Sequence, residues 1–387
     1  MPDRKTPVSS RRGDVPAFEA MQVLGAANAL EAEGRDVVHL EVGEPAGGAP
    51  RPAMEAARHA LERNSLGYTE ALGRMDLRRA IADLYRRRHG LELDPRRVVV
   101  TTGSSGGFTL AFLALFDAGA RVGLVEPGYP AYRNMLGALD LVPVGIPVDG
   151  SSGFNPTPEH LARAGRLDGL LVASPANPTG SMLRAEALAA LSGAVRAQGG
   201  HLISDEIYQG IQYGGVAATA LSVDPDAIVV NGFSKYFGMT GWRIGWMVVP
   251  ERLVPTIERL AQNFFISAPA LSQIAALSAL DAAAELDARV AVYARSRALL
   301  LEALPRLGFR DLAPPDGAFY IYARLPEGAE ASQQFCARLL RERGIALTPG
   351  IDFDPVRGHG TLRFSFAGPP DRIAEAVRRL EQAPLVG

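Results

Sequence analysis

Cysteine and lysine are both scarce in this chain of 387 residues. Its single cysteine, Cys336, excludes an internal disulfide framework and a cysteine-based zinc site. The six histidines show no HExxH or other close metal-ligand spacing, so we predict no metal site. Of the 40 basic residues, two are lysines, Lys5 and Lys235, which leaves 40 − 2 = 38 arginines. Wherever a positive charge alone is needed, this chain uses arginine.

An excess of one charge and long apolar runs are missing as well. Lys+Arg 40 against Asp+Glu 42 leaves a net charge of −2. Proteins that track a phosphate backbone need a marked cationic excess, so we expect no nucleic-acid partner. No apolar run approaches the roughly 18 residues of a membrane span. Arg11 and Arg12 are not followed by the apolar segment of an export signal. We therefore expect a soluble cytoplasmic protein with no membrane partner.

What the chain does contain is a strong α/β pattern. Hydrophobic residues make up 47% of it, enough for a large core, and its length fits two or three domains. From about residue 96 to 250, short apolar runs alternate with longer Ala/Leu/Arg-rich stretches of helical period, as in parallel sheets with crossover helices. We predict strands at 97–100, 122–125, 170–173, 202–204, 227–230 and 244–249, and helices at 105–116, 185–198 and 271–281.

After about residue 285 the pattern changes to an α+β arrangement. The predicted elements are a long helix at 289–304, apolar runs at 318–323 and 360–367, and a helix at 332–343 between the two runs. We predict a large α/β domain at 47–285 and a small C-terminal α+β domain at 286–387. Residues 1–46 should form an arm that contributes to the small domain. The helix near 286–304 is the expected hinge.

Lys235 is the residue whose type most needs an explanation. Lysine can lose its proton and attack a carbonyl to form a Schiff base, which arginine cannot do. Lys235 follows a predicted strand in the glycine-rich, aromatic segment AIVVNGFSKYFGMTGWRIGW, and Arg243 comes eight residues later. Lys5 lies near the chain start, where a surface charge is the expected role.

Polar residues follow three other predicted strands. VVVTTGSSGG leads through Gly103, Ser104 and Ser105 into a helix, whose N-terminus can bind phosphate, although neither GxxxxGK[ST] nor GxGxxG is present. Asn177 in SPANPTG and Asp205 in HLISDEIY each fit an ordinary turn or helix cap when taken alone. Ligands of doubly wound sheets bind at the carboxyl ends of the strands, so these groups should meet. A phosphate cup, a lysine, an arginine and a carboxylate together indicate a pyridoxal phosphate site.

Over nearly its whole length the chain resembles the fold-type I pyridoxal-phosphate enzymes of the class I/II aminotransferase family, which are aspartate aminotransferase-like. The segments that carry the resemblance are VVHLEVGEP, GYTEALGRMDLRRAIA, TTGSSGGF, EPGYPAY, ASPANPTG, SDEIY, FSKYFGMTGWRIGW and LRFSFA. SPANPTG and the segment around the lysine are the most specific. The resemblance implies an α/β fold with a large domain, whose mainly parallel sheet lies between helices, and a smaller α+β domain. It also implies pyridoxal 5'-phosphate as the cofactor.

The resemblance implies a role for each matching residue. Lys235 would hold the cofactor as an internal aldimine and then move the substrate proton, while Asp205 would pair with the pyridine nitrogen. Asn177 and Tyr208 would hydrogen-bond the phenolic oxygen, and Tyr129 would stack on the ring. The residues that the resemblance assigns to the phosphate are Ser104, Ser105, Ser234 and Arg243.

Substrate and subunit contacts are implied in the same way. Arg363 in TLRFSFA matches the arginine that binds the substrate α-carboxylate, with Gly43 and Asn177 as further substrate-binding residues. Tyr68 matches a tyrosine that reaches the phosphate of the neighbouring subunit, which implies a homodimer with shared active sites. Gly232 departs from the pattern, because many relatives have a serine there whose hydroxyl could bind the phosphate.

The implied reaction moves the amino group of an L-amino acid to a 2-oxo acid. A lyase or a cyclising enzyme that acts on an α-amino acid with a leaving group would use the same residues, so this alternative stays open. A non-catalytic ligand-sensing domain of a transcription regulator is a third hypothesis. It lacks support, because no N-terminal helix-turn-helix segment is present and Lys235 is retained. The amino donor, the acceptor and the side-chain pocket stay open.

Overall fold

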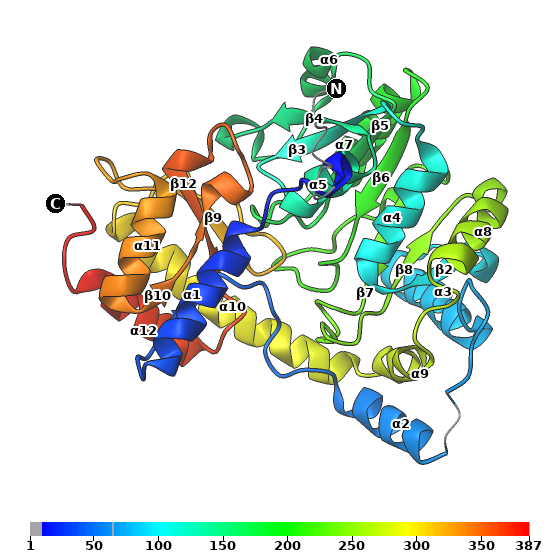
Figure 1. The fold of residues 1–387 in the computed structure, drawn as a ribbon, viewed down its shortest axis with the longest axis horizontal. Helices are drawn as coiled ribbons and strands as arrows, with labels where there is room; N and C mark the ends of the chain where they lie inside the picture. The colour runs from blue at the N-terminus through cyan, green and yellow to red at the C-terminus, as the bar shows by residue number, and fades with distance from the viewer. Residues whose placement is uncertain (1–9, 64–65, 387) are drawn as a thin grey trace, which may run out of the picture.

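The computed structural model describes residues 10–63 and 66–386, so Lys5 lies outside the described residues. Its largest feature is a seven-stranded sheet in the order β2-β8-β7-β6-β5-β3-β4, with helices on both sides (Figure 1). The strands are β2 (Val98–Thr101), β3 (Arg121–Glu126), β4 (Val142–Pro147), β5 (Gly169–Ala173), β6 (His201–Asp205), β7 (Ile228–Gly232) and β8 (Gly245–Val248). β8 runs antiparallel to both of its neighbours, and the other pairs are parallel. The predicted α/β fold with a mainly parallel sheet is confirmed.

One strand of this sheet, β4, is absent from the predicted strands. β4 lies at the sheet edge and pairs only with β3 among the described strands. Its sequence VPVGIP contains two prolines and a glycine, and Ile146 is the one fully buried residue among its six. Proline is tolerated on edge strands because one side of the ladder needs no donor. An edge strand of this composition therefore lacks the apolar run that marked the other strands.

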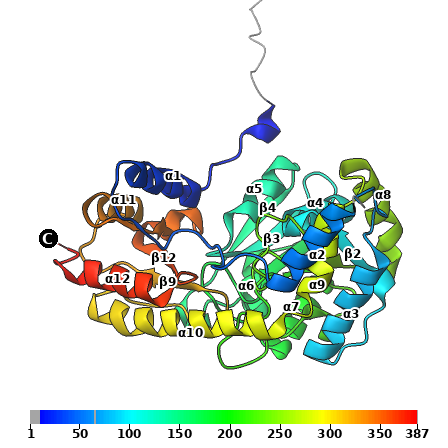
Figure 2. The same ribbon diagram turned by 90° about the horizontal axis from the view of Figure 1, so that it is seen from below.

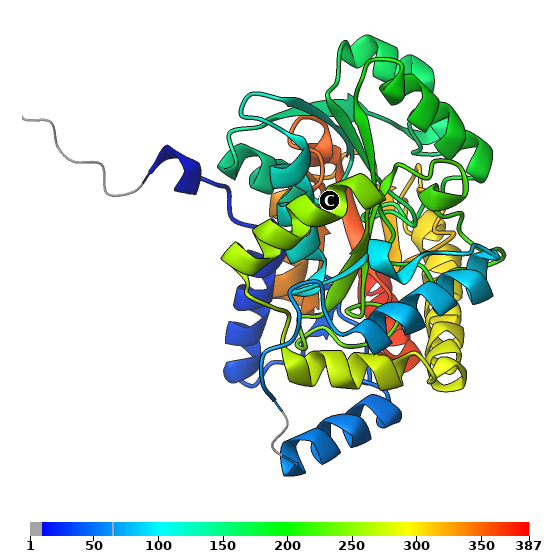
Figure 3. The same cartoon turned by 90° about the vertical axis from the view of Figure 1, so that its right-hand side faces the viewer.

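Alternate residues of the central strands enter two separate cores. Val99 of β2 packs with helices α4 (Gly103–Leu115), α5 (Pro130–Ala138) and α8 (Val254–Phe264). Its neighbours Val98 and Val100 belong to the core on the other face, which holds α3 (Met75–His89), α7 (Ala185–Arg196) and α9 (Ala270–Ala279). Burial of strand side chains on both faces explains why these strands appear as continuous apolar runs. α2 (Arg51–Glu62) lies against α9 at one end of the molecule (Figure 3).

The rest of the chain forms a smaller α+β part. β9 (Tyr320–Arg324), β11 (Thr348–Pro349) and β12 (Thr361–Ser365) make an antiparallel sheet in the order β11-β12-β9. The helices of this part are α10 (Ala283–Arg306), α11 (Ser332–Arg343) and α12 (Pro370–Glu381). The short helix α6 (Pro158–Ala164) belongs to the larger part, where it contacts β4 and α7. α10 runs along one side of the molecule as far as α12 (Figure 2). The predicted helix at 289–304 is confirmed, although it begins earlier.

The N-terminal segment joins this smaller part. β1 (Val38–His39) pairs in parallel with β10 (Ile345–Ala346), and α1 (Glu19–Ala32) lies beside α11 (Figure 2). Ala27 of α1 packs in a small core with Val37 and Leu340. The chain then crosses to the central sheet through residues 41–50. Among the helices that the structure describes, none is long and apolar enough to cross a membrane.

Candidate active site

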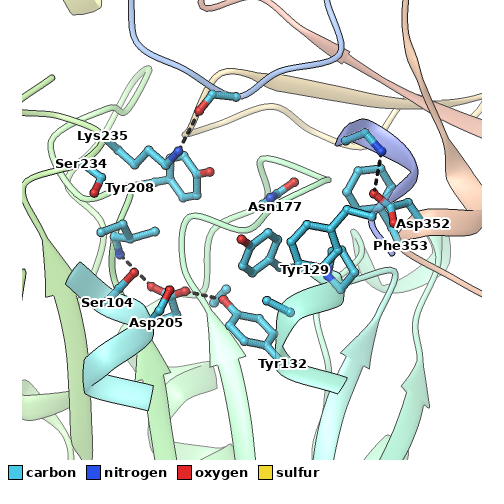
Figure 4. Close-up of a pocket in the computed structure, with 18 of the residues that line it drawn as sticks. Ser104, Tyr129, Tyr132, Asn177, Asp205, Tyr208, Ser234, Lys235, Asp352 and Phe353 are labelled. Carbon is cyan, nitrogen blue, oxygen red and sulfur yellow. Dashed lines mark hydrogen bonds between the residues drawn. The ribbon is translucent and has the colours of Figure 1, made fainter. Parts of the chain in front are cut away.

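A cavity of about 310 Å³ opens at the carboxyl ends of the central strands, where the two parts of the fold meet (Figure 4). Every predicted site residue except Tyr68 lines it, namely Gly43, Ser104, Ser105, Tyr129, Asn177, Asp205, Tyr208, Ser234, Lys235, Arg243 and Arg363. Tyr68 is 85% exposed and lines a different, open depression. The topology thus brings together residues that are up to 320 positions apart, as expected for a switch point of a doubly wound sheet.

Lys235 projects into the cavity from the loop after β7. Its Nζ donates a hydrogen bond to the carbonyl oxygen of Gly43 at 2.7 Å and lies 5.9 Å from the centre of the Tyr208 ring. Burial, and after it the positive charge of Arg363, lower the pKa of Lys235 to about 8. A depressed pKa raises the fraction of neutral amine, which is the form that attacks a carbonyl.

Asp205 ends β6 and is 4% exposed. Its carboxylate accepts hydrogen bonds from the hydroxyl of Tyr132 and from the backbone N–H of Ile207, the latter at 3.0 Å. Burial nevertheless raises the pKa of Asp205 to about 6, because these bonds and the charge of Lys235 offset the desolvation only in part. A protonated ring nitrogen placed beside this carboxylate would supply the missing opposite charge.

The start of α4 forms an anion-binding cup. Gly103 has φ +70°, and a Cβ there would lie 2.5 Å from Nη2 of Arg243. A Cβ on Gly245 would lie 2.9 Å from the backbone nitrogen of Ser104. Glycine at both positions therefore lets strand β8 and the Arg243 guanidinium approach the free N–H groups of the first helical turn. Together with the hydroxyls of Ser104, Ser105 and Ser234, which also line the cavity, this arrangement fits a phosphate group.

Arg363 on β12 forms a buried cation at the opposite side of the cavity. It is 4% exposed, and its Nη1 donates to Oδ1 of Asn177 at 3.0 Å. Its Nη2 donates to Oγ1 of Thr348 at 3.2 Å. The guanidinium lies 4.3 Å and 4.8 Å from the ring centres of Tyr320 and Phe353. Its Nε has no hydrogen-bond partner among the described residues. A buried guanidinium beside two aromatic rings, with a donor that has no partner among the described residues, suits a carboxylate.

The sequence of the chain matches the family model "Aminotransferase class I and II" over residues 35–380. The chain belongs to this family. It is an aminotransferase, an enzyme that transfers an amino group from an amino acid to a 2-oxo acid. The predicted family, fold and reaction class are therefore confirmed.

Relatives of this aminotransferase match it over nearly their whole length. A valine–pyruvate aminotransferase of Mycobacterium tuberculosis is 50% identical over 374 residues, which are 95% of this chain and 96% of the relative. The crystal structure of an aminotransferase from Mycobacterium tuberculosis has a TM-score of 0.94 at 49% identity, covering 97% of this chain and 98% of its own. Thermus thermophilus aspartate aminotransferase with maleate has a TM-score of 0.91 at 33% identity, covering 97% and 99%.

Two tyrosines that line the cavity of this aminotransferase were missing from the predicted site. Tyr132 comes three residues after Tyr129 in EPGYPAY, and the first turn of α5 brings the two rings to a centroid distance of 5.3 Å. That helical spacing was a signal for Tyr132. Tyr320 lies on β9, and its hydroxyl is hydrogen-bonded to that of Tyr208 at 2.8 Å. A Cβ on Gly43 would lie 1.7 Å from the Tyr320 hydroxyl, which explains this glycine.

Proposed function

We propose that this aminotransferase binds pyridoxal 5'-phosphate covalently through Lys235. The observation that carries the proposal is the placement of Lys235 in one cavity with a buried carboxylate and an anion cup. Arg243 and the first turn of α4 suit the phosphate, and Asp205 suits the ring nitrogen. The bound cofactor supplies an electron sink for the substrate Cα.

The chain's own residues would position the cofactor and move the proton. Lys235 Nζ would accept the proton that leaves the substrate Cα and carry it during the transfer. Asp205 would keep the ring nitrogen protonated through its negative charge. Asn177 and Tyr208 would hydrogen-bond the phenolic oxygen, and Tyr129 would pack against the ring. Ser104, Ser105 and Ser234 would complete the phosphate contacts.

The substrate would bind on the Arg363 side of the cavity. Arg363 would take the α-carboxylate, with Asn177, which accepts a hydrogen bond from Arg363, and the backbone of Gly43 as further contacts. Residues 47–285 hold the cofactor in this proposal, and residues 286–387 with the arm 1–46 supply the carboxylate clamp. Valine and pyruvate are the first substrate pair to assay, because the relative from Mycobacterium tuberculosis carries both in its name.

The proposal includes a homodimer with shared active sites. Tyr68 is exposed and remote from the cavity of its own chain, as a residue would be that reaches the phosphate of the partner subunit. Amino acids and 2-oxo acids are abundant cytoplasmic metabolites, so a cytoplasmic location belongs to the same proposal.

The lyase and the cyclising enzyme that the site residues left open would share proton removal at Cα with transamination, and the matched family and relatives favour transamination. The products separate them. An aminotransferase converts valine and pyruvate to 2-oxoisovalerate and alanine in equal amounts, whereas an elimination releases ammonia and a cyclisation consumes no acceptor.

The test is to purify the protein with pyridoxal 5'-phosphate and record its visible absorbance before and after borohydride. The expected result is a band that reduction removes, with the label on the Lys235 peptide. Lys235→Ala should lose the label, and the control Lys5→Ala should keep it. Label on Lys5, or no stoichiometric binding by the wild type, would overturn the cofactor assignment.

A further inference from the structure

Part of the cavity is not used by the proposed cofactor and carboxylate contacts, and this part is apolar. It is lined by Phe18, Met21, Tyr129, Met135 and Phe353. Phe18 and Met21 come from the start of α1, and the ring of Phe18 lies 6.0 Å from that of Tyr129. Tyr129 is the residue proposed to cover the cofactor. The apolar wall therefore lies next to the space that the side chain of the substrate, bonded to its Cα, would occupy.

Asp352 holds the start of α1 at this wall. Its side chain is buried, with 6% of the residue exposed, although it lies in the cavity lining. Oδ1 accepts the backbone N–H of Glu19 at 3.2 Å and Oδ2 accepts that of Ala20 at 3.4 Å (Figure 4). The first N–H groups of a helix have no partner within the helix, and a carboxylate there also complements the helix dipole. A side chain more than 330 positions away thus caps α1.

The same short segment connects the wall to the carboxylate clamp. Asp352 precedes Phe353, whose ring centre lies 4.8 Å from the Arg363 guanidinium. Residues 352 and 353 therefore touch both the start of α1 and the group proposed to bind the α-carboxylate. A substrate held by Arg363 would present its side chain to Phe18 and Met21, which α1 carries.

The charges around this space disfavour a second carboxylate. The cationic residues that line the cavity, among those the structure describes, are Lys235, Arg243 and Arg363, and each has a role in the proposed function. Of the acidic residues in the lining, Glu41 is paired with His39 at 2.7 Å, and Asp352, whose pKa is raised by burial, accepts the N–H groups of Glu19 and Ala20. A dicarboxylic substrate would thus bring its distal carboxylate into an apolar space with no free cation among the described lining residues, which is costly in a partly desolvated site.

Arg133 is a further cation that contacts the Asp352 segment. Its Nη1 lies 3.7 Å from Oε1 of Glu126, and its Nη2 donates to the carbonyl oxygen of Asp352 at 3.4 Å. Arg133 does not belong to the cavity lining. It neutralises Glu126 and supports the backbone of the Asp352 segment instead of facing the space for the side chain.

We infer that the substrate of this aminotransferase carries an apolar side chain, and that Asp352 is a positioning residue that makes this selection by holding the first turn of α1 at the cavity. The inference rests on the proposed function, because the side chain is placed by a substrate carboxylate on Arg363. Asp352 touches neither the cofactor nor the reacting atoms in this account.

The first experiment compares amino donors with the wild-type holoenzyme. The half-reaction with valine, leucine, alanine, aspartate and glutamate is followed by the change in visible absorbance under single-turnover conditions. Valine and leucine should exceed aspartate and glutamate in efficiency by roughly tenfold or more, because burying a carboxylate without a partner in an apolar space is costly. Aspartate or glutamate reacting as efficiently as valine would overturn the inference, and the cofactor assignment would stand.

The second experiment tests Asp352 by comparing KM for valine with KM for alanine and with the affinity for the cofactor. Loss of a helix cap by Asp352→Ala should raise KM for valine by roughly two- to thirtyfold, with cofactor affinity unchanged and a smaller effect on alanine. Asp352→Asn keeps an acceptor oxygen and should restore part of the loss. Asp94→Ala is the matched control, since Asp94 accepts the N–H of Arg96 at 2.8 Å at another helix start outside the cavity. Equal effects on valine and alanine would refute the role of Asp352.

Variants of the wall itself keep the inference testable if Asp352→Ala does not fold. Phe18→Ala and Met21→Ala remove apolar surface at positions that are not in the folded core, and Phe264→Ala removes an exposed ring elsewhere. The preference for valine over alanine should shrink in the first two variants and persist in the third. Unchanged preference in both wall variants would overturn the inference. A wild type that binds the cofactor on Lys235 but reacts with no amino acid would instead contradict the proposed function.

Discussion

The hydroxyl of Tyr132 donates a hydrogen bond to the carboxylate of Asp205 at the base of the cavity. Both residues are buried, at 6% and 4% exposure, and Tyr132 packs edge-on against the rings of Phe108 and Tyr129. The bond fixes the Asp205 carboxylate and favours its ionised form, while burial favours the protonated form. The Tyr129 ring that is proposed to cover the cofactor therefore rests on the residue that orients the cofactor's proposed ionic partner.

Replacing Asp205 by asparagine should change how the stability of the apoprotein depends on pH. Burial raises the pKa of Asp205 from 3.8 to about 6, so between these values the folded state keeps a proton that the unfolded chain has lost. Stability of the wild type therefore falls as pH rises through this window, by about 3 kcal/mol in total, and Asp205→Asn lacks this contribution. Urea unfolding of both apoproteins between about pH 4 and 7 measures it. Parallel pH profiles would contradict the prediction.

Tyr132→Phe should raise the pKa of Asp205 further. The variant removes the hydroxyl that stabilises the carboxylate, and a hydrogen bond to a charged group is worth about 1.5 to 3 kcal/mol, or roughly one to two pKa units. The upper end of the pH window of the apoprotein should move upward by that amount, while its lower end, set by the unfolded chain, should stay. Turnover near neutral pH should fall about tenfold or more. Tyr236→Phe is the control, because Tyr236 donates to Asp287 at 2.6 Å outside the cavity. Similar pH profiles for the wild type and Tyr132→Phe would exclude this role.

The parts of the site that could be predicted from sequence are those with a local signal. Asp205 ends an apolar strand, Asn177 and Lys235 lie in the loops just after two others, and parallel strands bring their carboxyl ends to one edge. Strand β4 and Tyr320 were missed for local reasons, the first because its prolines interrupt the apolar run and the second because a buried tyrosine in a strand resembles core.

The apolar wall could not be predicted for a different reason. Phe18 and Asp352 are joined only through the packing of α1 against the segment after β11, and nothing near either residue in the sequence indicates the other. Contacts of this kind depend on how two elements far apart in the sequence pack together. The position of a residue at a strand end, in contrast, follows from the strand that precedes it.

Gly245→Ala should weaken binding of the cofactor's phosphate. The new Cβ would lie 2.9 Å from the backbone nitrogen of Ser104 and from the backbone carbon of Gly103, so α4 and β8 must move apart. Overpacking of this kind costs about 1 to 3 kcal/mol, or roughly five- to 150-fold in affinity. Gly241→Ala is the control, since no atom lies within 4 Å of its Cβ position. Titration with pyridoxal 5'-phosphate and with pyridoxal should show the loss only for the phosphorylated form; equal losses would place the damage elsewhere.

Arg363→Lys should reduce kcat/KM for every amino acid by the same factor and leave binding of the cofactor unchanged. A lysine ammonium cannot reproduce the bidentate fork or stack between the rings of Tyr320 and Phe353. The expected loss is about 1.5 to 3 kcal/mol, or roughly ten- to two-hundredfold in kcat/KM. Arg297→Lys is the matched control, because Arg297 lies 5.1 Å from the Tyr213 ring centre and does not line the cavity. Full activity of Arg363→Lys, or equal reaction of amines without a carboxylate in the wild type, would remove Arg363 as the clamp.

Tyr68→Ala and Lys235→Ala should each be nearly inactive alone and recover activity when their subunits are mixed. Tyr68 is 85% exposed and does not reach the cavity of its own chain, so its proposed partner is the phosphate in the neighbouring subunit. In a mixed dimer the Lys235→Ala subunit supplies Tyr68 to the site that keeps Lys235, whereas the other site lacks both groups. Random pairing should restore about a quarter of wild-type activity, because half of the dimers are mixed and each has one complete site. Refolding the variants together and separately measures this, with sedimentation to establish the dimer. An active wild-type monomer, or mixtures no more active than their parts, would rule out the shared site.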